Sequence, residues 1–177
     1  MLYDPNIHHR RSLRLHEFDY SEARAYFVTL VTQGRENLFG KIVSGTMRHN
    51  IVGECAGAVW KRLPQYFAVN LDSWVIMPNH LHGILVLQET YRTPDQKAGK
   101  GSMKGTQPGS LNAIIQNFKS VSTRRINVLR NSPGIPVWQR DYYEHIIRDE
   151  EDWARIADYI ELNPVLWETD EENRPQM

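Results

Sequence analysis

The chain has one cysteine, Cys55, and it lacks several features that would assign it to a class of proteins. A single cysteine excludes a disulfide framework within the chain and fits a reducing compartment. No apolar run approaches the length needed to cross a bilayer, and the first residues lack the apolar core of a signal peptide. We therefore expect a cytoplasmic protein with no membrane partner, in which Cys55 fills the core rather than acting as a nucleophile.

The formal net charge of +0 argues against a protein coated uniformly with basic residues, but it conceals two segments of opposite charge. Residues 91–148 hold ten Lys and Arg against three Asp and Glu, whereas residues 149–177 hold two against ten. A basic middle can follow a phosphate backbone, while the acidic end stays solvated or pairs with basic residues. The pattern favours nucleic-acid binding without requiring it.

The length of 177 residues fits one domain with a real core. We expect an N-terminal arm at 1–13, a domain over 14–166, and an acidic tail at 167–177. Within the domain, residues 89–109 are rich in Gly, Pro and Lys, which predicts a flexible basic loop.

The hydrophobic periodicity predicts alternating strands and helices. The expected elements are a strand over 25–32, a helix from Ser44 until Pro64, paired strands over 71–77 and 80–87, a helix capped by Ser110, an extended stretch over 137–147 and a last helix from Asp149. This order predicts an α+β fold: a ferredoxin-like β-α-β-β-α-β antiparallel sheet with helices on one face and an added C-terminal helix.

Two histidines, His80 and His82, stand on the strand that we expect to be central, because its apolar residues lie on both faces. Residues two apart on a strand project from the same face, so both imidazoles point the same way. Two imidazoles on an apolar face make half of a metal site. The alternative is a pair of hydrogen-bonded structural histidines.

The last helix carries Tyr159 and Asn163, which are four residues apart and therefore share one helical face. Acidic residues fill its first turn, where they suit the helix dipole, and Pro164 ends it. Asn163 can supply a third metal ligand through its carbonyl oxygen, with the Tyr159 hydroxyl one turn away. The alternative is a helix stop at Asn-Pro and a tyrosine that only packs.

Three blocks in this order resemble the REP-associated tyrosine transposases, a group of HUH single-tyrosine transposases. The resemblance spans about residues 14–166 and nearly the whole chain. Its blocks are Trp74-Val-Ile-Met-Pro-Asn-His-Leu-His82, Trp138-Gln-Arg-Asp-Tyr-Tyr-Glu-His-Ile-Ile-Arg148 and Asp158-Tyr-Ile-Glu-Leu-Asn-Pro164.

The resemblance implies a DNA strand-transferase that cleaves and rejoins single-stranded DNA at hairpin-forming palindromic repeats. Tyr159 would be the catalytic nucleophile, leaving a 5′-phosphotyrosine link and a free 3′-hydroxyl. His80, His82 and Asn163 would hold Mg²⁺ or Mn²⁺ as the cofactor. Relatives act as monomers or homodimers, and both states stay open for this chain.

Several basic residues are candidates for contacts with the DNA backbone. They are Arg10, Arg11, Arg14, Lys97, Lys100, Lys104, Lys119 and Arg124. For each of them the alternative is a solvated surface position.

Other interpretations remain open at this point. Tyr142 and Tyr143 are rival nucleophiles, although neither has a ligand at the helical offset. The chain could also be a non-catalytic nucleic-acid-binding module, since ferredoxin-like sheets often bind RNA by stacking. A third interpretation is a metal-dependent hydrolase in which water attacks and no covalent adduct forms. Within the family, a mobile transposase and a domesticated enzyme are not distinguished.

Overall fold

A computed structural model describes residues 24–88 and 108–173 of the chain. None of the helices in these ranges is both long enough and apolar enough to span a membrane. The strands are β1 (Ala25–Val31), β2 (Gly40–Val43), β3 (Thr46–His49), β4 (Val69–Ile76), β5 (His80–Leu87) and β6 (Tyr143–Ile146). The helices are α1 (Ile51–Lys61), α3 (Leu111–Leu129) and α4 (Glu150–Leu162), with short 3₁₀ turns at Gln33–Arg35, Leu63–Gln65, Trp167–Thr169 and Glu171–Asn173.

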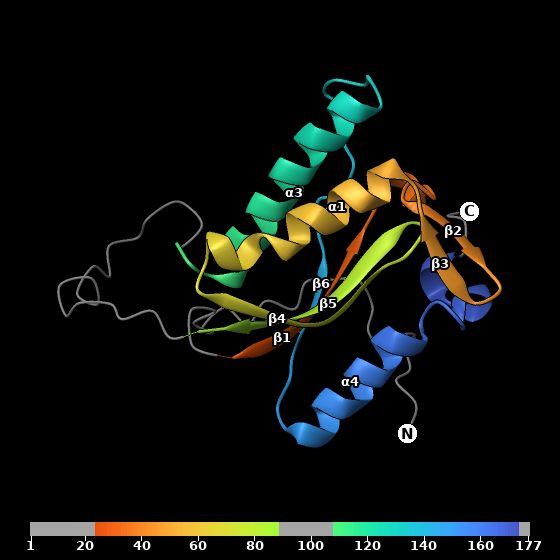
Figure 1. The fold of residues 1–177 in the computed structure, drawn as a ribbon. Helices are drawn as coiled ribbons and strands as arrows, with labels where there is room; N and C mark the ends of the chain where they lie inside the picture. Colours follow the sequence, from red (N-terminus) through yellow and green to blue (C-terminus); the bar gives the residue numbers. More distant parts are fainter. Residues whose placement is uncertain (1–23, 89–107, 174–177) are drawn as a thin grey trace.

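Four strands form one sheet in the order β4-β5-β1-β6, and every neighbouring pair is antiparallel. Helices α1 and α3 lie on one side of this sheet, whereas α4 lies on the other (Figure 1). The predicted α+β class with an antiparallel sheet is confirmed. β5 has a neighbour on each side, so the strand that carries both histidines is a central one, as its apolar pattern predicted.

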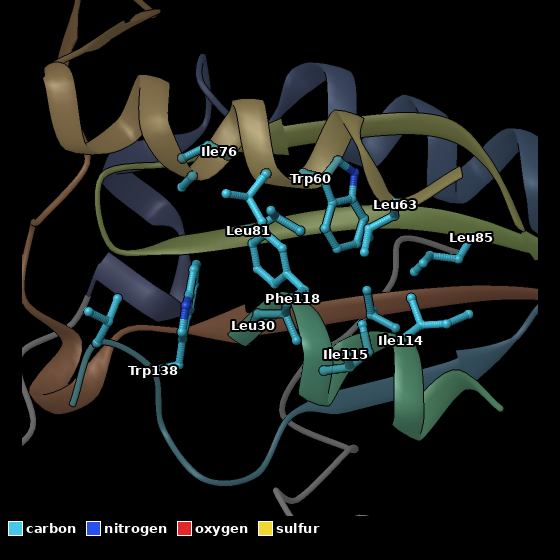
Figure 2. Close-up of a cluster of buried hydrophobic side chains, with 14 of the residues drawn as sticks. Leu30, Trp60, Leu63, Ile76, Leu81, Leu85, Ile114, Ile115, Phe118 and Trp138 are labelled. Atoms are coloured by element: carbon cyan, nitrogen blue, oxygen red, sulfur yellow. The ribbon is translucent and has the colours of Figure 1, made fainter. Parts of the chain in front are cut away.

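The main core lies between the sheet and the helices α1 and α3 (Figure 2). Leu81 and Leu85 of β5 point into it, together with Trp60 of α1 and Phe118 of α3. The rings of Trp60 and Phe118 meet edge to face, with centroids 5.1 Å apart. Gly83 lies between the two leucines, and a Cβ atom there would stand 2.7 Å from Cζ2 of Trp60. The sheet and α1 therefore approach as closely as a glycine allows.

A second, smaller cluster lies between the other face of the sheet and α4. Phe27 of β1 and Ile84 of β5 contribute to it from the sheet, and Ile156 and Ile160 contribute from the helix. Their burial fixes α4 along the face from which His80 and His82 project. The alternation of β5 thus places its leucines in one core and its histidines beside the other.

Cys55 lies on α1, is partly buried and packs against the main core. Burial raises the pKa of its thiol, while the nearby Arg125 guanidinium acts in the opposite direction. The thiol therefore stays protonated at neutral pH, which agrees with the predicted packing role.

The predicted helix from Ser44 is wrong over its first part, where the chain forms the hairpin β2–β3. Ser44 and Gly45 both have positive φ, at 48° and 70°, and they join Val43 to Thr46 in a two-residue turn. Such a turn matches the twist of a hairpin. The helix begins only after Asn50, whose side chain accepts hydrogen bonds from the first free backbone amides of α1.

Candidate metal and nucleophile site

The two histidines of β5 are almost completely buried, at 0% exposure for His80 and 2% for His82. Their ring centroids are 4.3 Å apart, so the two imidazoles share one small space on the α4 side of the sheet. Each ring is held through Nδ1. The Nδ1 atom of His80 lies 2.9 Å from Oδ1 of Asn79, and that of His82 lies 2.9 Å from Oγ1 of Thr29. Both Nε2 atoms consequently face the space between the rings and α4.

Asn79 sets the tautomer of His80. Its amide nitrogen donates to the carbonyl oxygens of Arg35, at 3.2 Å, and of Glu172, at 2.6 Å. These two hydrogen bonds identify the atom that faces His80 as the carbonyl oxygen Oδ1 of the amide. Because this oxygen can only accept a hydrogen bond, Nδ1 of His80 carries the proton. The neutral ring then presents a bare lone pair at Nε2, which is the state that binds a metal ion.

Burial also controls the charge of the histidine pair. It lowers the pKa of His80, against the opposing influence of Asp170, Glu172 and Asn163. The pKa of His82 is held well below its ordinary value, first by burial and then by repulsion from His80. Both rings are therefore neutral at pH 7, and both can act as nitrogen ligands.

Tyr159 reaches this space from the last turn of α4. Its hydroxyl oxygen lies 3.3 Å from Nε2 of His82, and its ring packs edge-on against Phe27. The start of α4 is fixed independently, because Asp149 caps it and Asp152 lies 2.7 Å from Nε2 of His145 on β6. The helix is thus anchored at its first turn and along its apolar face, and this places the hydroxyl beside the histidines.

Asn163 is the C-terminal cap of α4 and is 1% exposed. Its amide nitrogen donates a 2.7 Å hydrogen bond to Oδ2 of Asp170. Its Oδ1 atom is buried and has no hydrogen-bond partner, and neither has Nε2 of His80. A buried acceptor left unpaired costs about 1–3 kcal/mol, so two such atoms in one site indicate that a further group binds there.

Asp170 is a residue of this site that the sequence did not predict. It lies in a C-terminal turn, residues 167–173, within the segment that the sequence suggests is a solvated acidic tail. The ligand atoms of His80, His82 and Asp170 all lie within 4.8 Å of one another. Asp170 stands seven residues after Asn163, beyond the end of α4. No periodic pattern in the sequence predicts that this segment folds back onto the histidines.

The C-terminal turn is held against the sheet by Arg35 and Asn79. The guanidinium of Arg35 pairs with the carboxylate of Glu172 at 2.8 Å, and the Arg35 side chain is only 7% exposed. Asp170 itself receives the backbone N–H of Glu172 at Oδ1. The carboxylate is therefore fixed in place rather than free to sample solvent.

The donor set fits a divalent cation. Two imidazole nitrogens suit transition ions, whereas an amide oxygen and a carboxylate oxygen suit Mg²⁺ or Mn²⁺. The two unpartnered atoms, Nε2 of His80 and Oδ1 of Asn163, come from different elements and are the kinds of atom that a cation would satisfy. The predicted residues His80, His82 and Asn163 are thus brought together in the structure, with Tyr159 beside them.

The rival tyrosines occupy other positions. Tyr142 donates a 2.6 Å hydrogen bond to Asn112 of α3 and packs on the main core, away from the histidines. Tyr143 packs on the α4 side against Phe27. The hydroxyl of Tyr159 lies 3.3 Å from Nε2 of His82.

Two of the predicted DNA contacts lie on α3 within the described residues. Lys119 donates to the backbone carbonyl oxygens of Gln139, Arg140 and Asp141 at 3.0–3.2 Å, which engages the three N–H groups of its ammonium. Arg124 is exposed. The other predicted contacts lie outside the described residues: Arg10, Arg11, Arg14, Lys97, Lys100 and Lys104.

The fold and the sequence both relate the chain to transposases. No protein-family model matches it. The REP-associated tyrosine transposase solved in complex with a REP hairpin has the same fold, with a TM-score of 0.56 and 17% identity over 85% of this chain and 72% of that one. A Haemophilus influenzae protein named "Putative REP-associated tyrosine transposase" is 25% identical over 147 residues, covering 83% of this chain and 73% of its own length.

An uncharacterized protein of Haemophilus influenzae is more similar, at 41% identity over 175 residues and 96% of both chains. The chain therefore belongs to one family with that protein. The predicted resemblance to REP-associated tyrosine transposases is confirmed in both sequence and fold.

Proposed function

We propose that the protein is a metal-dependent single-stranded DNA transposase or endonuclease, which cleaves and rejoins DNA at hairpin-forming repeats through a 5′-phosphotyrosine intermediate. One observation carries the proposal. The hydroxyl of Tyr159 lies 3.3 Å from a buried, neutral histidine, beside two buried ligand atoms that have no partner. A tyrosine that served only in packing would not require its hydroxyl to lie beside a buried, neutral histidine and two unpaired ligand atoms.

A divalent cation, Mg²⁺ or Mn²⁺, would be held by His80, His82, Asn163 and Asp170. When bound, it would supply positive charge to the phosphoryl oxygens of a scissile phosphate. Asn79 and Thr29 serve the same site by fixing the two imidazole rings.

The chain's own residues would position the nucleophile and supply the attacking oxygen. Phe27 and the packing of α4 hold the Tyr159 oxygen beside the histidines, because α4 is anchored at both its first turn and its apolar face. The phenol oxygen forms a bond to phosphorus and the bond from phosphorus to the 3′-oxygen breaks. The phenol proton passes to solvent and the leaving oxygen takes one up as a 3′-hydroxyl. Attack by a second 3′-hydroxyl reverses the step, so joining needs no external energy source.

A DNA hairpin is the partner that we infer, since the structural relative is bound to a REP hairpin. We also assign the sheet to the ferredoxin-like class, supported by the chain order β1-α1-β4-β5-α3-β6 and the strand order β4-β5-β1-β6. On this assignment, α4 is the added C-terminal helix that brings the nucleophile to the sheet.

The test uses labelled single-stranded DNA carrying palindromic repeats from the neighbourhood of the gene, incubated with Mg²⁺ or Mn²⁺. Denaturing gels would compare wild type with Tyr159→Phe and His80→Ala, and with Tyr143→Phe as a matched control. We expect a covalent protein–DNA band in wild type and in Tyr143→Phe alone. Cleavage that survives Tyr159→Phe would instead indicate a hydrolase in which water attacks.

Asp170→Asn and Asn79→Ala separate the supporting roles at the metal. Asp170→Asn removes a charge from the ligand set, and Asn79→Ala leaves His80 free to take the wrong tautomer. We expect Mn²⁺ affinity, measured by calorimetry, to fall about 10- to 100-fold in Asn79→Ala, as for other partners of metal-bound histidines. Unchanged affinity in both variants would remove these residues from the site.

A further inference from the structure

A groove on the opposite side of the sheet from Tyr159 has features that the catalytic proposal does not use. It lies between the end of α1, the 3₁₀ turn that follows it, and the middle of α3, and its volume is about 250 Å³. Val59, Leu63 and Val121 give it an apolar lining. Figure 1 shows α1 and α3 side by side above the sheet, with α4 on the other side.

Two arginines from different elements stand at this groove, Arg62 at the C-terminal cap of α1 and Arg125 on α3. Both are exposed, and no carboxylate lines the groove. Neither arginine makes an ion pair with any residue that the structure describes. Two unneutralised guanidinium groups over an apolar floor suit an anion that carries an apolar part, and phosphate is the anion that arginine binds best through paired N–H groups.

The third feature is an exposed aromatic ring held beside one of these arginines. Tyr66 is 63% exposed, and its hydroxyl accepts a 2.8 Å hydrogen bond from Nη2 of Arg62. The Arg62 guanidinium carbon lies 5.8 Å from the ring centroid, and its Nε atom donates to Gln65 at 3.2 Å. Arg62 is thus oriented before any ligand arrives. An exposed ring next to a fixed cation is a platform on which a nucleobase stacks.

We propose that this groove binds a nucleotide of single-stranded DNA, with its base against Tyr66 and its phosphates on Arg62 and Arg125. A volume of about 250 Å³ is below the roughly 300–1,000 Å³ of pockets for whole small ligands, so one base of a longer strand is the better fit. The proposal rests on the proposed function in taking the same class of substrate. It adds a second contact surface on the side of the sheet opposite Tyr159.

The test measures affinity of the full chain for a fluorescent, unstructured single strand by anisotropy, with chelator present so that no cleavage occurs. Wild type is compared with Tyr66→Ala, Tyr66→Phe and Arg125→Glu, and with Arg48→Glu on the exposed part of β3 as a control of equal charge change. Circular dichroism melting of each variant establishes that it is folded.

We expect Tyr66→Ala to weaken binding about 5- to 100-fold and Tyr66→Phe to retain most of it, as for other base-stacking rings. Arg125→Glu should weaken binding. It should also reduce the slope of log affinity against log salt concentration by about 0.7 for each phosphate that the variant no longer binds. Arg48→Glu should change neither the affinity nor the slope. Equal affinity of all variants would overturn the proposal. So would a free mononucleotide that binds as tightly as the strand, because the groove would then be a site for small nucleotides.

Assaying the covalent adduct on the same preparations distinguishes the two proposals. Groove variants that bind like wild type while the adduct still forms would refute the groove alone. Groove variants that bind weakly, with no adduct in any preparation, would refute the tyrosine chemistry and leave the groove standing.

Discussion

The buried histidine pair makes the stability of the metal-free protein depend on pH in a predictable direction. His80 and His82 are neutral in the folded chain because burial lowers their pKa values. In the unfolded chain each titrates near its ordinary pKa of about 6.5. Below that pH the unfolded state binds more protons, so the free energy of unfolding falls as the pH falls.

The size of the effect follows from the same linkage. Each histidine that is neutral when folded and charged when unfolded contributes a slope of about 1.4 kcal/mol per pH unit. Between pH 7 and pH 5 one such histidine removes about 2 kcal/mol, and the pair removes up to about 4 kcal/mol. His82 should supply its full share, because its pKa is the more strongly lowered of the two.

Urea unfolding over this pH range, in the presence of chelator, measures the slope. The control is His82→Gln, which keeps a polar side chain but cannot be protonated. We expect its slope to be smaller than that of wild type by about 1.4 kcal/mol per pH unit below pH 6, whatever its absolute stability. Equal slopes in the two proteins would show that His82 is charged in the folded state or is exposed to water, and would refute the neutral pair.

The remaining predictions concern two glycines in the packing of α1 against the sheet and two basic residues of α3. Gly83→Ala should destabilise the protein by about 1–3 kcal/mol, because the new Cβ would stand 2.7 Å from the Trp60 ring. Gly57→Ala on α1 should instead stabilise it by up to about 1 kcal/mol, because its new Cβ would meet the nearest atom at 3.5 Å. Thermal melting of the two variants measures the difference. Lys119→Met should lower stability by about 1–2 kcal/mol and leave DNA affinity unchanged, while Arg124→Ala should lower affinity without loss of stability. Loss of affinity in Lys119→Met at unchanged stability would contradict the assignment of its ammonium to the backbone.

The sequence could predict those parts of the site that depend only on the residue repeat of a single strand or helix. The two-residue repeat of a strand places His80 and His82 on one face, and the four-residue offset on α4 places Tyr159 above Asn163. The leucines between and after the histidines identified β5 as a central strand. Each of these inferences needs only the geometry of one element.

The parts that sequence could not predict depend on chain that leaves a regular element. Asp170 reaches the histidines through 3₁₀ turns that are fixed by Arg35, far away in the sequence. Asn79 acts through an amide whose two donors are engaged by carbonyls of distant residues. The hairpin β2–β3 carried a local signal, the Ser44-Gly45 turn, which the apolar periodicity of the following helix obscured.

The central claim is that Tyr159 becomes covalently joined to DNA. Its most direct test is peptide mapping by mass spectrometry of the adduct formed with a single-stranded hairpin substrate and Mn²⁺. We expect the peptide containing Tyr159 to carry the nucleotide through a 5′-phosphate, and Tyr159→Phe to give no adduct. An adduct on Tyr143, or cleavage of the substrate without any adduct, would contradict it.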